Sequence, residues 1–333
     1  MQALNGWLKA VRADGLVLAR TRVAGPWGFE MQSRDAVVFH FAAEGRAFVR
    51  QADAEPMELG AGELVLFPRG NAHEVAHSKR GKAMPLATFL ARRDGVVDRD
   101  AKATTLICGQ FNMDQHLALP ALRALPQAVL LRAGMEPGGS PLSDTLRMLR
   151  NEVETPNFGN HIVVRNLLSS LFVYFIREWA DAASPAANDW FSALRSPQMT
   201  RVLARIHEAP ERAWTLEKLA KEAALSRATF ARNFCASVGE PPHQYLTRWR
   251  MGIAAQLLEE TELRLGEIAA RVGYKSEFTF SRAFKLARGI SPIQYRRARG
   301  NDQRAARSST FIERIKTRTT APKASGRPRR APS

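Results

Sequence analysis

The sequence predicts a multidomain α+β protein with an N-terminal β domain, a helical connector and a C-terminal all-α domain. Three observations predict it. Short apolar runs separated by turn residues fill the first part of the chain. A nine-residue pattern, S-x-x-T-F-x-R-x-F, occurs at Ser226–Phe234 and again at Ser276–Phe284. The basic charge is confined to the C-terminal half, where residues 195–298 hold 18 Lys and Arg against 10 Asp and Glu.

Composition and charge limit the classes of protein to which the chain can belong. It has 333 residues, 45% of them hydrophobic and 24% charged, which suits two or more globular domains. The net charge of +17 lies almost entirely beyond residue 194, because residues 1–194 are nearly neutral. A basic C-terminal half favours a polyanionic partner such as nucleic acid, although charge alone would also suit an anionic membrane.

Several features predict a cytoplasmic protein that does not enter a membrane. The two cysteines, Cys108 and Cys235, make no disulfide framework. The first fifteen residues lack the apolar segment of a secretory signal. The most apolar run, Ile162–Ile176, is too short to span a bilayer and contains Arg165.

The N-terminal half is typical of β structure from residue 16 to 131, because apolar runs such as AVVFHF and GELVLFP alternate with Gly, Pro, Asp and Asn turns. Gly and Pro cluster at Leu130–Pro141 and indicate a connector. Apolar residues three and four apart then predict helices over 142–154 and 160–182. The segment DAASPAAND is typical of a linker.

The C-terminal half is helical from Trp190 to Ala298, with the repeated pattern inside two copies of one unit. In each copy a short helix is followed by a tight turn and a serine, Ser226 or Ser276, placed to cap a second helix. Phenylalanines four apart give that second helix a buried face, and its other face is basic and polar. This is the helix-turn-helix plan.

The helix predicted between the two copies explains why they are about fifty residues apart. It begins near Pro242 and is about 27 Å long at 1.5 Å per residue. A rod of this length would hold two recognition helices about one turn of B-DNA apart, ~34 Å. After the second copy, Ser291 and Pro292 predict the start of a closing helix.

Residues 195–298 resemble the DNA-binding domain of the AraC/XylS family of bacterial transcription regulators. The segments WTLEKLAKEA, GEPPHQYLTRWRM, EIAARVGYKSEFTFSRAFK and GISPIQYRR follow the family pattern. The resemblance implies that the chain binds promoter DNA, with RNA polymerase as a further partner if it is an activator, which is the commoner case. The DNA-binding residues implied are Arg227, Ala228, Thr229, Ala231 and Arg232 in the first recognition helix, and Glu277, Phe278, Thr279, Arg282 and Lys285 in the second. Of these, Arg232 and Arg282 suit bidentate contacts to guanine, whereas Ala228 and Ala231 can only touch a thymine methyl.

The segment GAGELVLFPRGNAHEVAH resembles the second signature motif of the cupin β-barrel, with His73 and His77, and HFAAEG resembles part of the first motif, with His40 and Glu44. The resemblance implies a cupin-like sensor domain ahead of the DNA-binding domain. These four side chains are candidate ligands for an effector or a divalent metal such as iron, nickel or zinc. Because Val38 replaces one histidine of the first motif, a metal-free barrel is the alternative that we favour.

Cys108 lies in a predicted strand, just before Gly109, and is a candidate redox residue, since relatives of this type include oxidant sensors; a small buried side chain is the other interpretation. The helices of 142–182 lie where the family often forms homodimers, but their apolar face would equally cover the barrel. We expect a regulator controlled by a small-molecule or oxidant effector and not an enzyme; the alternative is a metal-dependent cupin enzyme fused to a DNA-binding module.

The predicted domain boundaries follow from these segments. They are a cupin-like domain over 1–132, a helical connector over 140–185, the double helix-turn-helix domain over 190–298 and a basic disordered tail over 299–333.

Overall fold

The structure is a computed structural model that describes residues 2–52, 54–91, 103–132, 139–155, 157–182 and 189–298. By its internal contacts the chain divides into two compact units, residues 1–253 and 254–333, with the boundary inside helix α10 (Pro242–Glu260). The first unit thus joins the predicted N-terminal domain, the connector and the first helix-turn-helix. The predicted tail, 299–333, and the connector residues 133–138 and 183–188 lie outside the described residues.

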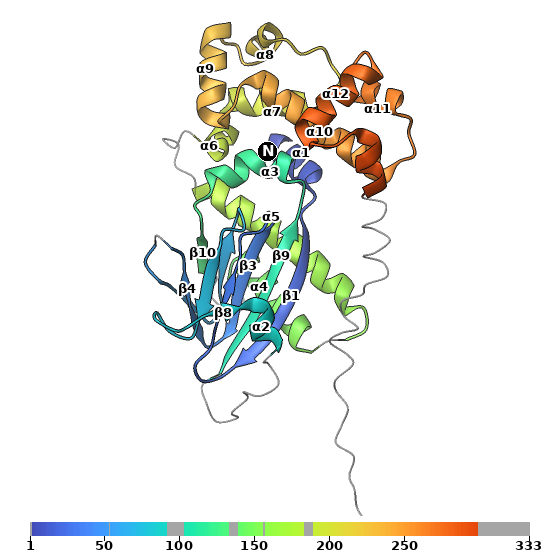
Figure 1. The fold of residues 1–333 in the computed structure, drawn as a ribbon. Helices are drawn as coiled ribbons and strands as arrows, with labels where there is room; N and C mark the ends of the chain where they lie inside the picture. The colour runs from blue at the N-terminus through green and yellow to red at the C-terminus, as the bar shows by residue number, and fades with distance from the viewer. Residues whose placement is uncertain are drawn as a thin grey trace, which may run out of the picture. The chain divides into compact units, whose positions relative to one another are not determined.

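Two five-stranded sheets form the N-terminal domain (Figure 1). The first sheet is antiparallel throughout and has the order β1 (Asp14–Val23), β9 (Thr104–Asn112), β3 (Val37–Glu44), β6 (Glu63–Phe67), β10 (Val129–Arg132). The second has the order β5 (Met57–Gly60), β4 (Arg46–Arg50), β7 (His73–Ala76), β2 (Gly28–Met31), β8 (Met84–Pro85), and only its β2–β8 pair is parallel. The predicted β domain is confirmed at this level. In the described strands the pairing gives two sheets and not one closed barrel.

Strand β3 shows why its sequence is almost continuously apolar. Successive side chains of a strand point to opposite faces of the sheet. Val38 and Ala42 belong to the core between the two sheets, whereas Phe39 and Phe41 belong to the core between the first sheet and the helices. Because both faces of the sheet are covered here, every side chain of β3 before Glu44 is buried.

Three helices of the N-terminal domain were not predicted. They are α1 (Gln2–Val11), α2 (Leu86–Ala91) and α3 (Gln115–Ala124). In α1 the buried residues Ala3, Trp7, Ala10 and Val11 recur at intervals of three and four. Helix α3 begins at the N-cap Asp114, whose carboxylate accepts a hydrogen bond from the Leu117 amide.

The two connector helices match the predicted ranges to within one residue: α4 (Pro141–Glu154) and α5 (Asn160–Ala182). Helix α5 buries Leu168, Leu171, Phe172, Phe175 and Ile176, but Ile162, expected on the same buried face, is 56% exposed. No helix in the described part of the chain is long and apolar enough to cross a membrane.

The C-terminal half is helical as predicted. Its elements are α6 (Trp190–Arg195), α7 (Pro197–Glu208), α8 (Leu216–Glu222), α9 (Arg227–Val238), α10, α11 (Leu265–Arg271) and α12 (Glu277–Arg288). Ser226 and Ser276 cap α9 and α12, and each hydroxyl accepts a hydrogen bond from the amide three residues later at 3.2 Å. The phenylalanines of the repeat, Phe230, Phe234, Phe280 and Phe284, are fully buried. Both predictions are confirmed.

The turns of the two helix-turn-helix units have the same backbone hydrogen bonds but differ at one residue. In the first, the Leu225 amide donates to the Ala220 carbonyl; in the second, the Tyr274 amide donates to the Ala269 carbonyl. Both bonds need a left-handed residue just before the donor. That residue is Gly273 (φ 81°) in the second turn, but Ala224 (φ 53°) in the first. The first turn therefore carries backbone strain that the second avoids.

We expect Gly273→Ala to destabilise its unit by about 1 kcal/mol, because a Cβ is unfavourable at this backbone conformation. Ala224→Gly should leave stability unchanged or raise it, since relief of strain offsets the extra entropy of the unfolded chain. Thermal unfolding of the full chain measures both. The matched control is Ala270→Gly, on an exposed helical position, which should cost about 1 kcal/mol. Equal losses at 224 and 270 would contradict the strain at Ala224.

Candidate functional site

The outer faces of α9 and α12 carry every residue that the sequence assigned to DNA contact. In α9, Arg227, Ala228 and Arg232 are exposed, and Thr229 and Ala231 are half-buried. In α12 all five assigned residues are exposed: Glu277, Phe278, Thr279, Arg282 and Lys285. Phe278 is 79% exposed, which is unusual for a large apolar side chain outside a binding surface.

The first turn of each recognition helix is fixed by a hydroxyl pair. Ser226 donates to the Thr229 hydroxyl at 2.9 Å, and the Ser276 and Thr279 hydroxyls are bonded in the same way. The cap therefore orders both the backbone and the threonine side chain before any DNA is bound. Two arginines on α9, with Arg282 and Lys285 on α12, then provide donors on an exposed surface.

A buried polar cluster links two predicted sites that the sequence treated separately. The His40 ring lies between two partners: its Nε2 is 2.7 Å from His73 Nε2, and its Nδ1 is 3.0 Å from the Cys108 sulfur. The register of β3 and β9 places His40 directly opposite Cys108. All three side chains are buried in the apolar core between the two sheets.

The hydrogen-bond donors in this cluster follow from one backbone carbonyl. His73 Nδ1–H donates to the Asn71 carbonyl at 2.7 Å, so His73 Nε2 is an acceptor. His40 Nε2–H then donates to it, and His40 Nδ1 accepts from the Cys108 thiol. Each buried polar group is satisfied when both imidazoles and the thiol are neutral.

The pKa values agree with this neutral arrangement. Burial, followed by the neighbouring His73, holds the pKa of His40 well below its usual range. Burial lowers the pKa of His73 to about 4, despite the Asn71 hydrogen bond, which raises it. Burial raises the pKa of the Cys108 thiol to about 12. At neutral pH the thiol therefore stays protonated and is not a reactive thiolate.

Glu44 and His77 lie apart from this cluster. A register shift in β3 between Ala42 and Glu44 turns the carboxylate away, and it bonds to Thr105 and Arg150. The His77 Nδ1 is 2.9 Å from the Trp27 carbonyl oxygen, beyond the end of β7.

The four candidate ligands do not fit a metal centre. His40 and His73 already share one hydrogen bond, and Cys108 is on the opposite side of the His40 ring from His73. Among the described residues no group of three or more His, Cys, Asp or Glu side chains is arranged to hold a metal ion. The divalent metal that the motifs suggested has no ligand set in this part of the chain.

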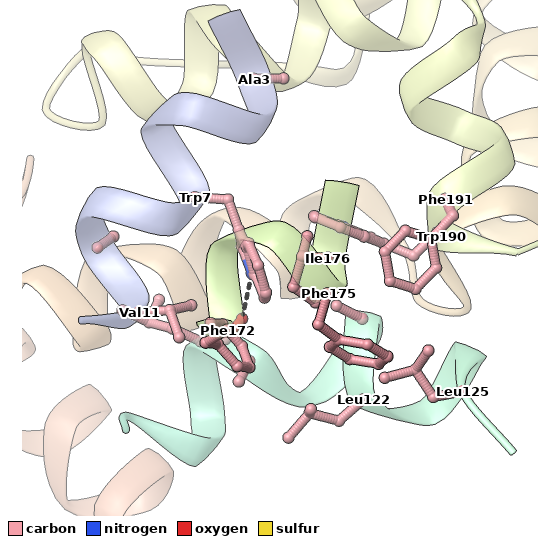
Figure 2. Packing of buried hydrophobic residues seen from close by; sticks show 14 of the residues in the cluster. Ala3, Trp7, Val11, Leu122, Leu125, Phe172, Phe175, Ile176, Trp190 and Phe191 are labelled. Atoms are coloured by element: carbon pink, nitrogen blue, oxygen red, sulfur yellow. Dashed lines mark hydrogen bonds between the residues drawn. The ribbon is translucent and has the colours of Figure 1, made fainter. Parts of the chain in front are cut away.

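Within the first unit, the N-terminal domain and the first helix-turn-helix share a continuous apolar core around Trp7 (Figure 2). The Trp7 ring packs on Trp190 of α6, with centroids 4.7 Å apart, and on Phe172 of α5. Its Nε1–H donates to the Leu117 carbonyl of α3 at 3.1 Å. Helix α1 thus joins elements from both halves of the sequence, because 110 residues separate Trp7 from Leu117 and more separate it from Trp190.

A half-buried histidine lies in the same junction. His207 of α7 stacks on Trp249 of α10, with ring centroids 3.7 Å apart. Its Nδ1–H donates to the Ala3 carbonyl of α1 at 3.2 Å, and its Nε2 accepts from the Tyr245 hydroxyl at 2.6 Å. Burial lowers the pKa of His207 to about 3, outweighing the Ala3 hydrogen bond, which raises it.

Both halves of the sequence match known protein families. Residues 2–181 match the family model described as Cupin, and residues 219–298 match the model described as Helix-turn-helix domain. The HTH-type transcriptional regulator AlkR of Acinetobacter baylyi is 31% identical over 304 residues, which are 89% of this chain and 99% of that protein. The RCS-specific HTH-type transcriptional activator RclR of Escherichia coli is 29% identical over 299 residues, 89% of this chain and 97% of that protein.

Among solved structures, the C-terminal domain of AraT, a response regulator from Geobacillus stearothermophilus, is 41% identical. It covers 31% of this chain and 87% of that chain, with a TM-score of 0.30. The full-length relatives are named as regulators of transcription and not as enzymes.

The sequence did not predict the junction. The spacing of Ala3, Trp7 and Ala10 is a sequence signal for helix α1. No sequence signal pairs Trp7 with Trp190 or His207 with Ala3, because these contacts depend on how separate elements pack.

Acid is expected to destabilise the first unit. The folded pKa values of His40, His73 and His207 lie below the ordinary value of 6.5, so below that pH the unfolded chain binds more protons than the folded chain. Stability is therefore full above pH 6.5 and is lost as the pH falls, by about 1 to 2 kcal/mol per histidine at pH 5. Urea unfolding at pH 7, 6 and 5, followed by tryptophan fluorescence, measures this.

Two exposed histidines, His161 and His243, provide controls. His161→Ala and His243→Ala should keep the same pH dependence as the unchanged chain. An unfolding midpoint that stays constant from pH 7 to pH 5 would contradict the neutral buried histidines.

Proposed function

Because the chain belongs to the AraC/XylS family of transcription regulators and has an N-terminal cupin domain, we propose that α9 and α12 bind two successive major-groove segments of promoter DNA. The observation that carries the proposal is the duplication itself. Two exposed, basic recognition helices have the same serine cap, the same turn hydrogen bond and the same pair of buried phenylalanines. Helix α10, about 28 Å long, connects them and suits segments one helical turn apart.

Within this proposal the recognition residues have different roles. Arg232 and Arg282 bind guanine through two parallel N–H donors. Ala228 and Ala231 touch thymine methyl groups, and Phe278 packs against an apolar base edge or sugar. Arg227 and Lys285 contact phosphate, while the threonines hold the helix start.

We propose that the N-terminal domain receives a small-molecule effector. A cavity of about 190 Å³ is a candidate site for it; the cavity lies among α3, the start of α6 and the C-terminal end of α9, and its lining includes Pro120, Trp190, Val238 and Arg248. His40 and His73 would act by holding the core of the domain, not by binding the effector. Control by an oxidant at Cys108 would first require the cluster to open, because the buried thiol is protonated.

The remaining partners follow from the family. We propose a cytoplasmic activator that contacts RNA polymerase, as the activator name of one relative suggests. A homodimer would use the helices α4 and α5 and the turn between them, where Met148, Phe158, Ile162 and Val163 are exposed.

DNA-affinity selection tests the function. Purified protein is mixed with fragmented genomic DNA at near-physiological salt, and the retained fragments are sequenced. We expect a motif of two blocks about ten base pairs apart. Uniform recovery without a motif would contradict a sequence-specific reader.

Arg282→Ala should weaken binding to the selected site by about 1–3 kcal/mol and relax base choice at one position. Fluorescence anisotropy with the selected site and with single-base variants measures both effects. The control is Arg271→Ala, which removes the same charge from α11 and should leave base preference unchanged. Unchanged selectivity in Arg282→Ala would refute its role as a base reader.

A further inference from the structure

In the first unit, helices α3 and α10 approach closely at a glycine. A Cβ on Gly252 of α10 would lie 2.4 Å from the side-chain carbons of Leu117 on α3, so no larger residue fits there without movement. On the other side of α1, a Cβ on Gly6 would lie 3.1 Å from His207 Nδ1. Helices α1 and α3 of the N-terminal domain therefore pack closely on α7 and α10, and a glycine allows each approach.

One arginine of α10 is bonded to the backbone of α3. Pro120 in the middle of α3 has no N–H, so it cannot donate the usual helical hydrogen bond to the His116 carbonyl. Arg248 NH1 donates to that carbonyl at 2.6 Å and also reaches the Leu117 carbonyl at 3.4 Å. A side chain from the DNA-binding half thus supplies the hydrogen bond to the His116 carbonyl that Pro120 cannot make.

The Arg248 guanidinium is held in place by the DNA-binding half itself. Its Nε donates to Glu240 at 2.9 Å, and its NH2 bonds to the same carboxylate oxygen. It lies over the Tyr245 ring, 4.8 Å from the centroid, and only 12% of the side chain is exposed. A largely buried arginine that donates through two nitrogens to one carboxylate oxygen has a defined orientation, which a lysine cannot reproduce.

From Arg248 the contacts continue to the recognition helix. Tyr245 packs edge-on against Phe234 of α9, with centroids 5.7 Å apart, so the orientation of α9 depends on α10. On the N-terminal side of α3, Asp114, its N-cap, lies six positions after Cys108 on β9. A change in the pairing of β9 would therefore shift the carbonyls that Arg248 binds.

We propose that Arg248 is the positioning residue through which the N-terminal domain and the first DNA-reading helix control each other. The inference rests on the proposed DNA-binding function. Coupling between two sites is reciprocal, so DNA bound to α9 must stabilise the N-terminal domain as much as that domain stabilises DNA binding. No effector needs to be known to measure this.

Cys108 provides the measurement, because its thiol is 5% exposed and reacts only when the N-terminal domain opens. Cys235 is the one other cysteine in the sequence and is removed as Cys235→Ser in every variant. The rate of reaction with dithionitrobenzoate is measured in the full chain, without DNA and with a saturating amount of the DNA fragment retained in the selection experiment. Anisotropy confirms saturation for each variant.

We expect saturating DNA to slow the reaction of Cys108 by about fivefold or more in the chain with Arg248. In Arg248→Ala and Arg248→Lys, the logarithm of the ratio of the Cys108 reaction rates without and with DNA should fall to less than half of its value in the chain with Arg248. Arg250→Ala is the matched control, because Arg250 donates to the Pro210 and Arg212 carbonyls inside the DNA-binding half. It should keep the full effect.

Pro120→Ala separates positioning from stability and serves if the arginine variants do not fold. Alanine supplies a backbone N–H that competes with Arg248 for the His116 carbonyl, so α3 becomes more stable while its bond to Arg248 weakens. The effect of DNA on Cys108 should fall even though the thermal midpoint rises. A purely structural role would move both in the same direction.

The outcomes are distinct. A change below about fivefold in the presence of Arg248, with DNA demonstrably bound, overturns the inference and leaves the proposed function intact. Arginine variants or Pro120→Ala that keep at least half of the effect also overturn it. If the chain with Arg248 binds no selected DNA at all, the proposed function fails first, and the inference fails with it.

Discussion

The burial of Trp7 is the constraint on which the arrangement of the first unit depends. An indole of this size removes a large apolar area from water, and its N–H needs a partner once it is buried. Both needs are met together: the ring packs on Phe172 and Trp190, and the N–H donates to the Leu117 carbonyl. The partners come from α3, α5 and α6, so one side chain holds the sheet domain, the connector and the DNA-binding half in a common core. This explains why the compact unit extends to residue 253 and does not end near the predicted boundary at 132.

The DNA-binding half was predictable from sequence because its signals are local. A serine cap and phenylalanines four apart act within about one turn of each recognition helix, and both were placed correctly. The helices α4 and α5 were predictable for the same reason. In contrast, Ile162 fits the apolar period of α5 yet is exposed, because periodicity gives the face of a helix but not the length of the surface that covers it. Helices α1 and α3 were not predicted, because the segments next to them have the alternating pattern of β-strands.

The candidate ligands in the N-terminal domain show the limit of motif spacing. His40 and His73 contact each other, as the two cupin-like segments suggested. The irregularity after Ala42 places Glu44 away from this pair, and His77 lies beyond the end of β7. Cys108 joins instead, since strand pairing places it opposite His40. Register and bulges are set by the packing of the whole sheet. For that reason motif spacing identified two members of the cluster but did not connect Cys108 with them.

The same strands that carry this polar cluster also carry the core that reaches the DNA-binding half. On β3, His40 faces the second sheet, whereas Phe39 and Phe41 face the helices; on β9, Cys108 and Ile107 divide in the same way. A close-packed interior transmits displacement, since few voids exist to absorb it. Opening the cluster on one face of β3 and β9 would therefore move the apolar side chains on the other face, which contact the helices around Trp7. Because the polar cluster and the apolar core around Trp7 share strands β3 and β9, a displacement in the first can reach α10 through direct packing.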